Sequence, residues 1–217
     1  MVKADGKVLI GIYRDLFKSF GPQQWWPGET PFEVIIGAIL TQNTNWKNVE
    51  KAISNLKSSG KLSPAAFLTI PEQKLAELIR PAGYFNVKAK RLKNFIRFFF
   101  DAYKGKISLM KKAPLSRLRE ELLSVNGIGE ETADSILLYA LEKPVFVVDA
   151  YTKRIFYRHK IIQSDADYQT VQKHFMDNLP RNQLLFNEYH ALIVKTAKKF
   201  CRAKTCCALC PLKKYLQ

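Results

Sequence analysis

The chain lacks a long apolar run, has few acidic residues, and has no cysteine before Cys201. No apolar stretch approaches the roughly 18–20 residues of a membrane span, so we expect no membrane contact. The first residues lack a secretory cleavage pattern. A disulfide framework would spread its cysteines along the chain, but all four lie between 201 and 210. These absences favour a cytoplasmic, nucleoid-associated location and cysteines that bind a metal.

The shortage of acids leaves a large positive charge. The sequence has 35 Lys and Arg against 19 Asp and Glu, a formal net charge of +16. Residues 86–119 hold eleven Lys or Arg and one acid, and residues 195–217 hold seven and none. A solvated helix face would normally interleave acids for local pairing. The pattern favours a polyanionic partner, with nucleic acid as the first choice. A device for solubility is the plainer alternative.

Strand-like sequence is almost absent. The only such run is 145–148, which is too short and solitary to build a sheet. Elsewhere apolar residues recur with the 3.6-residue period of a helix, and Gly and Pro mark the ends of several segments. We therefore predict an all-α fold. Its helices are expected at 8–20, 32–40, 46–57, 72–80, 86–103, 115–125, 130–141, 150–158, 165–178 and 182–200.

One interruption between helical segments carries two glycines. Residues 122–134 read LLSVNGIGEETAD, so that Asn126, Gly127, Ile128 and Gly129 separate the two helices. The first N–H groups of a helix have no internal partner, and the helix dipole makes that end positive. A phosphate could therefore bind the bare backbone. A plain turn between two helices is the alternative explanation of these residues.

The longer context resembles a known family. LLSVNGIGEETADSILLYALEKPVFVVDAYTKRIFYR is similar to the helix–hairpin–helix, Gly/Pro-rich loop and catalytic aspartate of the endonuclease III superfamily of DNA glycosylases. FEVIIGAILTQNTNWKNVEKAI, RPAGYFNVKAKRLKNF and the cysteine cluster resemble further motifs of that family, in the same order. The resemblance implies two helical lobes flanking a DNA cleft. A six-helix barrel with the hairpin would span 31–133, and an N-terminal helix in 1–30 would join 134–217 in the second lobe.

The resemblance also assigns roles to two polar residues. Asp149 matches the catalytic aspartate, whose carboxylate would stabilise the oxocarbenium-like transition state and orient water. It directly precedes a predicted helix, so it is also expected to be that helix's N-cap. Gln42 matches the residue that fills the gap left by a flipped nucleotide. Its alternative is a plain polar residue at a helix end.

Position 131 departs from the lyase members of the family. Those proteins carry a lysine there, whose amine forms a Schiff base with the sugar. Here Glu131 follows Glu130, and a carboxylate cannot form an imine. The sequence therefore predicts a monofunctional glycosylase that leaves an abasic site. A first-turn acid favoured by the helix dipole is the alternative role of Glu131.

Three tryptophans suggest a base pocket. Trp25 and Trp26 precede Pro27, and Trp46 follows Thr-Gln-Asn-Thr-Asn. This arrangement resembles the 3-methyladenine glycosylase branch of the family. Alkylated purines are cationic, so stacked indoles would attract them through cation–π interaction. We expect these three residues and Glu131 to line the pocket, with core packing as the alternative for the indoles.

The cysteines match the family least well. The family's [4Fe–4S] spacing is C-x6-C-x2-C-x5-C, whereas Cys201, Cys207 and Cys210 give C-x5-C-x2-C and Leu216 stands at the fourth position. Cys206 could substitute as the fourth ligand. The resemblance implies a [4Fe–4S] cluster on these four cysteines. A three-cysteine cluster, a zinc site or no metal stay open.

Taken together, the motifs predict a base excision repair enzyme that hydrolyses the N-glycosidic bond of an alkylated purine such as 3-methyladenine. Its partner would be double-stranded DNA with a damaged base, bound by a monomer. An endonuclease III-like glycosylase/lyase for oxidised pyrimidines is the alternative enzyme. A non-catalytic DNA-binding module using only the hairpin is the third possibility.

Overall fold

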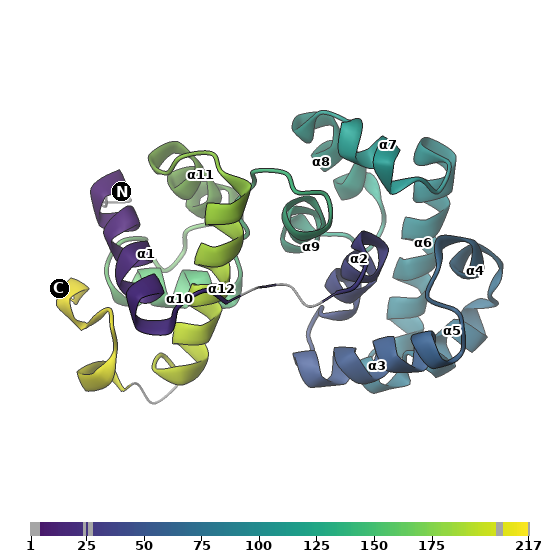
Figure 1. Ribbon diagram of the computed structural model, residues 1–217, viewed down its shortest axis with the longest axis horizontal. Helices are drawn as coiled ribbons and strands as arrows, with labels where there is room; N and C mark the ends of the chain where they lie inside the picture. Colours follow the sequence, from purple (N-terminus) through teal and green to yellow (C-terminus); the bar gives the residue numbers. More distant parts are fainter. Residues whose placement is uncertain (1–4, 24, 26–27, 203–205, 217) are drawn as a thin grey trace. The chain divides into compact units, whose positions relative to one another are not determined.

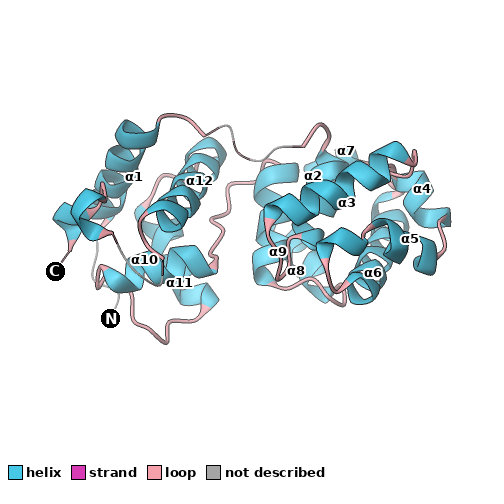
Figure 2. Cartoon of the chain, turned by 90° about the horizontal axis from the view of Figure 1, so that it is seen from below, coloured by secondary structure: helices cyan, strands magenta, loops and turns pink. Residues whose placement is uncertain are grey.

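A computed structural model describes residues 5–23, 25, 28–202 and 206–216 of the chain. Twelve α-helices occur in these residues and are joined by loops and short helical turns (Figure 1). No strand is found in this part of the chain (Figure 2). The predicted all-α class is confirmed. None of the described helices is long and apolar enough to cross a membrane.

The chain divides into two compact units, Met1–Trp25 with Pro144–Gln217, and Trp26–Lys143. These limits lie near the lobe boundaries expected at 30/31 and ten residues beyond those expected at 133/134. The division into functional lobes stays a prediction.

The first unit joins both ends of the chain. α10 packs against α12, and α1 packs against α11 and α12. Its core is aromatic: the rings of Phe146 and Phe175 stack at 4.0 Å, and Phe156 meets Phe175 edge-on. Tyr189 is fully buried and donates its hydroxyl to Leu9 O at 2.8 Å, which ties α12 to α1. The helices are α1 (Gly6–Phe20), α10 (Ala150–Arg158), α11 (Tyr168–Asn178) and α12 (Gln183–Lys199), followed by the 3₁₀ turns η3 (Cys207–Leu209) and η4 (Lys213–Tyr215).

The second unit is built around α2. Every α2 residue from Phe32 to Leu40 is buried, because α3, α6, α9 and η2 surround the helix. A helix that is apolar on all sides is stable only inside such a shell, and each buried Ile or Leu contributes roughly 1.5–3 kcal/mol. The elements are α2 (Pro31–Leu40), α3 (Trp46–Ser58), α4 (Pro64–Thr69), α5 (Glu72–Leu78), η1 (Arg80–Ala82), α6 (Phe85–Tyr103), α7 (Ile107–Lys112), α8 (Leu115–Ser124), α9 (Glu130–Ser135) and the π-helical η2 (Ile136–Ala140).

Local sequence explains where most helices begin. Seven N-cap side chains each accept a hydrogen bond from a backbone N–H in the first turn of the helix that follows: Asp5, Thr30, Asn45, Ser63, Asp149, Asp167 and Asn182. These residue types are favoured N-caps because they satisfy N–H groups that have no partner within the helix. The cap places the start of α11 at Tyr168, three residues later than predicted.

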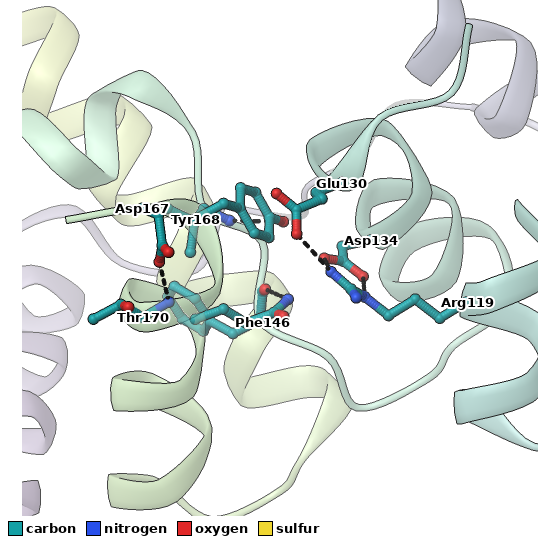
Figure 3. Close-up of polar contacts among 9 residues, drawn as sticks. Arg119, Glu130, Asp134, Phe146, Asp167, Tyr168 and Thr170 are labelled. Atoms are coloured by element: carbon teal, nitrogen blue, oxygen red, sulfur yellow. Dashed lines mark hydrogen bonds and ion pairs between the residues drawn. The ribbon is translucent and has the colours of Figure 1, made fainter. Parts of the chain in front are cut away.

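Two features differ from the predicted elements. The six-residue helices α4 and α7 were not predicted, because they are too short to show a helical period. The continuous helix expected over 130–141 becomes α9 and a π-helical turn. The apolar run 145–148 is a buried irregular segment, as expected from its isolation, and side chains satisfy its backbone. Phe146 O accepts from Gln172 Nε2 at 2.7 Å, and Val148 N donates to the Tyr168 hydroxyl at 3.3 Å (Figure 3).

Candidate active site

The hairpin between α8 and α9 uses its two glycines differently. Gly127 has a φ of +96°, and a Cβ on it would lie 2.3 Å from Cγ of Arg91. Gly129 is extended, and a Cβ on it would meet nothing within 4 Å. Glycine is therefore required at position 127 by the positive φ and by the close approach of the Arg91 side chain. The backbone is open at Gly129, while Ile128 anchors the turn in the core at 4% exposure. Phosphate binding at the hairpin stays a prediction.

A buried ion pair clamps the two helices of the hairpin. Arg119 of α8 donates from Nε to Oδ1 of Asp134 at 2.8 Å and from Nη2 to Oδ2 at 3.0 Å (Figure 3). Asp134 is fully buried, and Glu130 lies 3.6 Å from the same guanidinium. The fork-shaped pairing restricts the angle between α8 and α9. The ion pair therefore fixes the two helices that flank the turn, while Asn126 and Gly129 in the turn remain exposed.

Gln42, the predicted wedge residue, is held against the hairpin in this structure. Its Nε2 donates to Gly127 O at 3.0 Å and to Thr132 Oγ1 at 2.9 Å, and its Oε1 accepts from Arg91 at 2.5 Å. Gln42 follows the C-terminal end of α2, so this network joins the α2–α3 loop, α6 and the hairpin. To enter a duplex, the amide would have to exchange these bonds. Its role as a wedge stays a prediction.

Asp149 caps α10, as expected. Its Oδ1 accepts from the backbone N of Thr152 at 2.7 Å and from the Thr152 hydroxyl at 2.9 Å. Its Oδ2 lies 3.4 Å from Nε2 of His190 on α12. The carboxylate is buried, with the residue 9% exposed. Its catalytic role stays a prediction, and the geometry provides a carboxylate held by two elements of one unit.

The surroundings of Asp149 favour its charged form. Burial by itself would raise the pKa of the carboxyl, but the charge and hydrogen bond of His190 and the two hydrogen bonds from Thr152 lower it by more. The net result is a pKa below the ordinary value of about 3.9. Asp149 is therefore ionised at neutral pH, which is the state required to stabilise a developing cation.

The tryptophans line separate pockets in the two units. Trp25 lines one of about 640 Å³ with Tyr13 and Leu184, and Trp46 lines one of about 510 Å³ with Glu33 and Glu50. Trp26 lies outside the described residues. Glu131 is exposed in the first turn of α9, the position that suits an acid beside a helix N-terminus. A common base pocket for these residues stays a prediction.

Comparison with known proteins identifies the family. Residues 36–181 match the model of the HhH-GPD superfamily base excision DNA repair proteins. The chain belongs to this family. It is a DNA N-glycosylase with an endonuclease III-like fold.

Individual relatives support the assignment. The glycosylase is 52% identical, over 96% of both chains, to a Methanocaldococcus jannaschii protein provisionally named a DNA repair glycosylase. It is 27% identical to endonuclease III of Sulfolobus acidocaldarius, over 85% of this chain and 80% of the relative. The crystal structure of H. pylori 3-methyladenine DNA glycosylase bound to 1,N6-ethenoadenine matches with a TM-score of 0.77 and 30% identity, over 90% of this chain and 98% of that chain. A non-covalent endonuclease III–DNA complex shares the fold, with a TM-score of 0.83 at 22% identity over 99% and 96% of the two chains.

Two lysines of the basic segment 86–119 are buried in the glycosylase. Lys88 donates to Leu40 O and Ala82 O at 2.9 and 2.8 Å, and Lys93 donates to Phe67 O at 2.8 Å. Burial, and then the charge of Arg91, lowers the pKa of Lys88 to about 8. These lysines satisfy carbonyls at helix ends, so the surface charge of the segment is smaller than its composition suggests. In the sequence, only the apolar residues around these lysines in α6 indicate this function.

The structure also adds residues that the sequence analysis did not select. Arg91, Thr132 and His190 contact Gln42 or Asp149, although each lies at least 40 residues from its partner in sequence. Nothing in the local sequence distinguishes His190 from an ordinary residue of a buried helix face. Thr152 was accessible to prediction, since it lies three residues after an N-cap aspartate.

The four cysteines gather near the C-terminus but differ in exposure. Cys201 is buried, Cys207 and Cys210 are half-buried, and Cys206 is exposed. Burial and then the charges of the other three cysteines raise the pKa of the Cys210 thiol, partly offset by a hydrogen bond from the backbone at Leu212. Cys201, Cys207 and Cys210 line a cavity of about 30 Å³, and Cys206 does not.

These positions fit a four-cysteine [4Fe–4S] cluster poorly. In the part of the chain that the structure describes, no three His, Cys, Asp or Glu side chains are arranged to hold a metal ion. The cavity is about the size of one water molecule, which is too small for a core of four irons and four sulfides. The cluster stays a prediction.

Proposed function

We propose that this glycosylase is monofunctional and excises alkylated purines such as 3-methyladenine from duplex DNA. The observation that carries the proposal is the side chain at position 131. Glu131 is exposed on the first turn of α9, where an attacking amine would otherwise stand. The hairpin beside it accepts hydrogen bonds from the amides of Gln42 and Asn94, and neither can form an imine. Strand cleavage through a Schiff base therefore lacks its nucleophile at this site.

Base release is assigned to Asp149 and water. As the N-glycosidic bond breaks, positive charge develops on the sugar, and an ionised buried carboxylate stabilises it. A carboxylate can also orient the water that attacks C1′, and the product is an abasic site with an intact strand. An alkylated purine is already cationic, so it leaves without needing a strong acid to protonate it. Weak acid catalysis on the base is then sufficient.

The pocket beside Trp46 supports a cationic substrate. Trp46 Nε1 donates to Glu50 Oε1 at 2.9 Å, which orients the indole. Three carboxylates, those of Glu29, Glu33 and Glu50, line the pocket against one ammonium group, that of Lys57. A cationic ring gains attraction from both the indole face and the surplus negative charge. A neutral oxidised pyrimidine would gain neither. The 30% identity with a 3-methyladenine glycosylase bound to an ethenoadenine base points the same way.

The decisive assay uses duplexes that each contain one defined lesion. We expect release of 3-methyladenine, strand breaks that appear only after alkali, and no covalent adduct on borohydride treatment. Efficient borohydride trapping on oxidised-pyrimidine DNA would instead establish the glycosylase/lyase alternative. Release of no base from a broad lesion panel would leave only a DNA-binding module.

A second test addresses the indole. Trp46→Ala should lower excision of 3-methyladenine, whereas Trp46→Phe, which keeps an aromatic face, should retain most of it. Thermal unfolding checks that both variants fold, because Trp46 is only half-buried in the first turn of α3. If Trp46→Ala excised 3-methyladenine as well as Trp46→Phe and the wild type do, Trp46 would not belong to the base pocket.

The same proposal covers the partner and location. The enzyme acts as a monomer on double-stranded DNA in the nucleoid, with phosphates contacted by exposed Lys and Arg and by the hairpin backbone. Such contacts position the protein without reading sequence.

A further inference from the structure

His190 of α12 is buried beside the candidate catalytic carboxylate. The residue is 5% exposed, and its Nε2 lies 3.4 Å from Oδ2 of Asp149. This is within ion-pair distance when the imidazole is protonated. A polar ring on an otherwise apolar helix face is therefore placed directly against the group to which base release is assigned.

The two oxygens of the Asp149 carboxylate have different kinds of partner. Oδ1 accepts from the backbone N and the hydroxyl of Thr152 at 2.7 and 2.9 Å, contacts that an aspartate makes when it caps a helix. Oδ2 instead contacts a different helix, through His190. Rotation about the terminal bond of an aspartate side chain has only broad preferences. A contact to the second oxygen, made from another helix, therefore defines the plane of the carboxylate.

Packing of aromatic rings fixes where the imidazole lies. Phe186 and Tyr189, which precede His190 on α12, meet the ring of Phe146 edge-on, with ring centroids 5.5 and 5.8 Å apart. Phe146 belongs to the irregular segment that leads to Asp149. Because α12 is packed on this segment, it cannot rotate or slide without disturbing the backbone that carries the carboxylate. The same packing therefore positions the imidazole and the carboxylate.

We propose that His190 is a positioning residue of the glycosylase, which fixes the orientation of the Asp149 carboxylate before the base is released. The neutral ring does this in the tautomer that carries its hydrogen on Nε2, and the protonated ring adds an ion pair. A carboxylate that is already aimed at the developing positive charge needs no reorganisation as the N-glycosidic bond breaks. The inference rests on the proposed role of Asp149, and it does not depend on which lesion is removed.

The same contact favours the ionised form of the carboxylate. His190 faces it from α12, and α10 supplies the two hydrogen bonds from Thr152. Burial raises the pKa of Asp149, and the charge of His190 is the largest of the influences that lower it, ahead of the bonds from Thr152. Loss of the imidazole charge should therefore raise the pKa of Asp149. Because the ionised carboxylate is the active form, excision by such a variant should decline at a higher pH than excision by the wild type.

Two amide variants of the full-length protein separate positioning from packing. His190→Gln brings an amide nitrogen near the place of Nε2, whereas the shorter side chain of His190→Asn cannot reach it. In single-turnover excision at neutral pH, His190→Gln should stay within about threefold of the wild type and His190→Asn should lose about 10- to 100-fold, the scale of a misplaced catalytic group. Affinity for lesion DNA should not change in either variant. The rate of His190→Gln should nevertheless decline at a higher pH than that of the wild type, because the amide carries no charge.

The matched control is His174→Asn. His174 lies on α11 of the same unit and is also buried, but its Nδ1 lies 3.4 Å from Nδ2 of Asn178 and not beside the carboxylate. This variant should excise at the wild-type rate. A loss equal to that of His190→Asn would show that any buried histidine of the unit has the same effect, and would overturn the proposal.

A double-mutant cycle with Asp149→Asn decides whether His190 acts through the carboxylate. If it does, adding His190→Asn to Asp149→Asn should lower excision by less than about twofold, since the two residues act as one unit. Equal fold losses in both backgrounds, or normal excision by His190→Asn alone, would overturn the positioning role and leave the role of Asp149 intact. Near-wild-type excision by Asp149→Asn would overturn both.

Circular dichroism checks the folding of each variant. If His190→Asn does not fold, His190→Gln decides the question by itself. A loss of more than about tenfold at neutral pH in folded His190→Gln, well beyond what a retained contact allows, would contradict the proposal. An acid decline at the same pH as in the wild type would contradict it too.

Discussion

Replacing Asp149 by asparagine separates the helix cap from the negative charge. Asparagine caps helices as well as aspartate does, so its Oδ1 can still accept from the backbone N and hydroxyl of Thr152. Only the charge facing His190 is lost. We expect the variant to lose about 1 kcal/mol or less of stability, a Tm change of roughly 2–4 °C for a protein of this size. Asp149→Ala also removes the cap and should cost about 0.5–2 kcal/mol more.

The chemical step should respond far more strongly. Removing a preorganised group that stabilises transition-state charge typically lowers kcat by about 10²–10³. Single-turnover excision by Asp149→Asn should fall at least a hundredfold, while affinity for lesion DNA stays near that of the wild type. The matched control is Asp167→Asn. Asp167 caps α11 by accepting from Thr170 N at 2.7 Å (Figure 3). Because Asp167 is exposed, its variant should excise normally.

The pH dependence gives an independent check. The pKa of Asp149 lies below its ordinary value of about 3.9. A carboxyl with a lowered folded-state pKa stabilises the fold above its unfolded pKa, and this contribution disappears as the pH falls through the folded value. The stability difference between wild type and Asp149→Asn should therefore shrink only below about pH 4. Near-wild-type turnover by Asp149→Asn, or an equal loss in Asp167→Asn, would refute the assignment.

Three further predictions concern the hairpin and the surface charge. Gly127→Ala should lower Tm because it forces a positive φ and displaces Arg91, whereas Gly129→Ala should keep Tm and weaken DNA binding in a fluorescence titration. Asp134→Asn should cost up to about 3–5 kcal/mol in denaturant unfolding, since it breaks a buried pair, although Glu130 at 3.6 Å still offsets part of the charge of Arg119. Affinity for undamaged duplex should fall by orders of magnitude between about 50 and 200 mM salt, and a flat response would contradict phosphate contacts by the exposed basic residues.

The sequence alone determined the features that depend on neighbours along the chain. Helical periodicity placed most helices, and Asp149 was recognisable as a cap because a cap bonds to the helix that directly follows it. The hairpin was visible for the same reason, since a positive φ at Gly127 is a local demand. That the described residues form no sheet followed from the isolation of residues 145–148. The short helices α4 and α7 were not predicted, because six residues are too few to show a helical period.

Only the tertiary structure decided how distant residues combine. Gln42 and Gly127 are 85 residues apart, and their hydrogen bond requires α2, α6 and the hairpin to pack together. Packing also decided that Lys88 and Lys93 are buried and donate to backbone carbonyls, because their burial depends on which helices cover α6. His159 lines one cavity with Cys201, Cys207 and Cys210 for the same reason, because the end of α10 lies beside the end of α12. Composition counts charges and thiols, but packing decides which of them face solvent and which face one another.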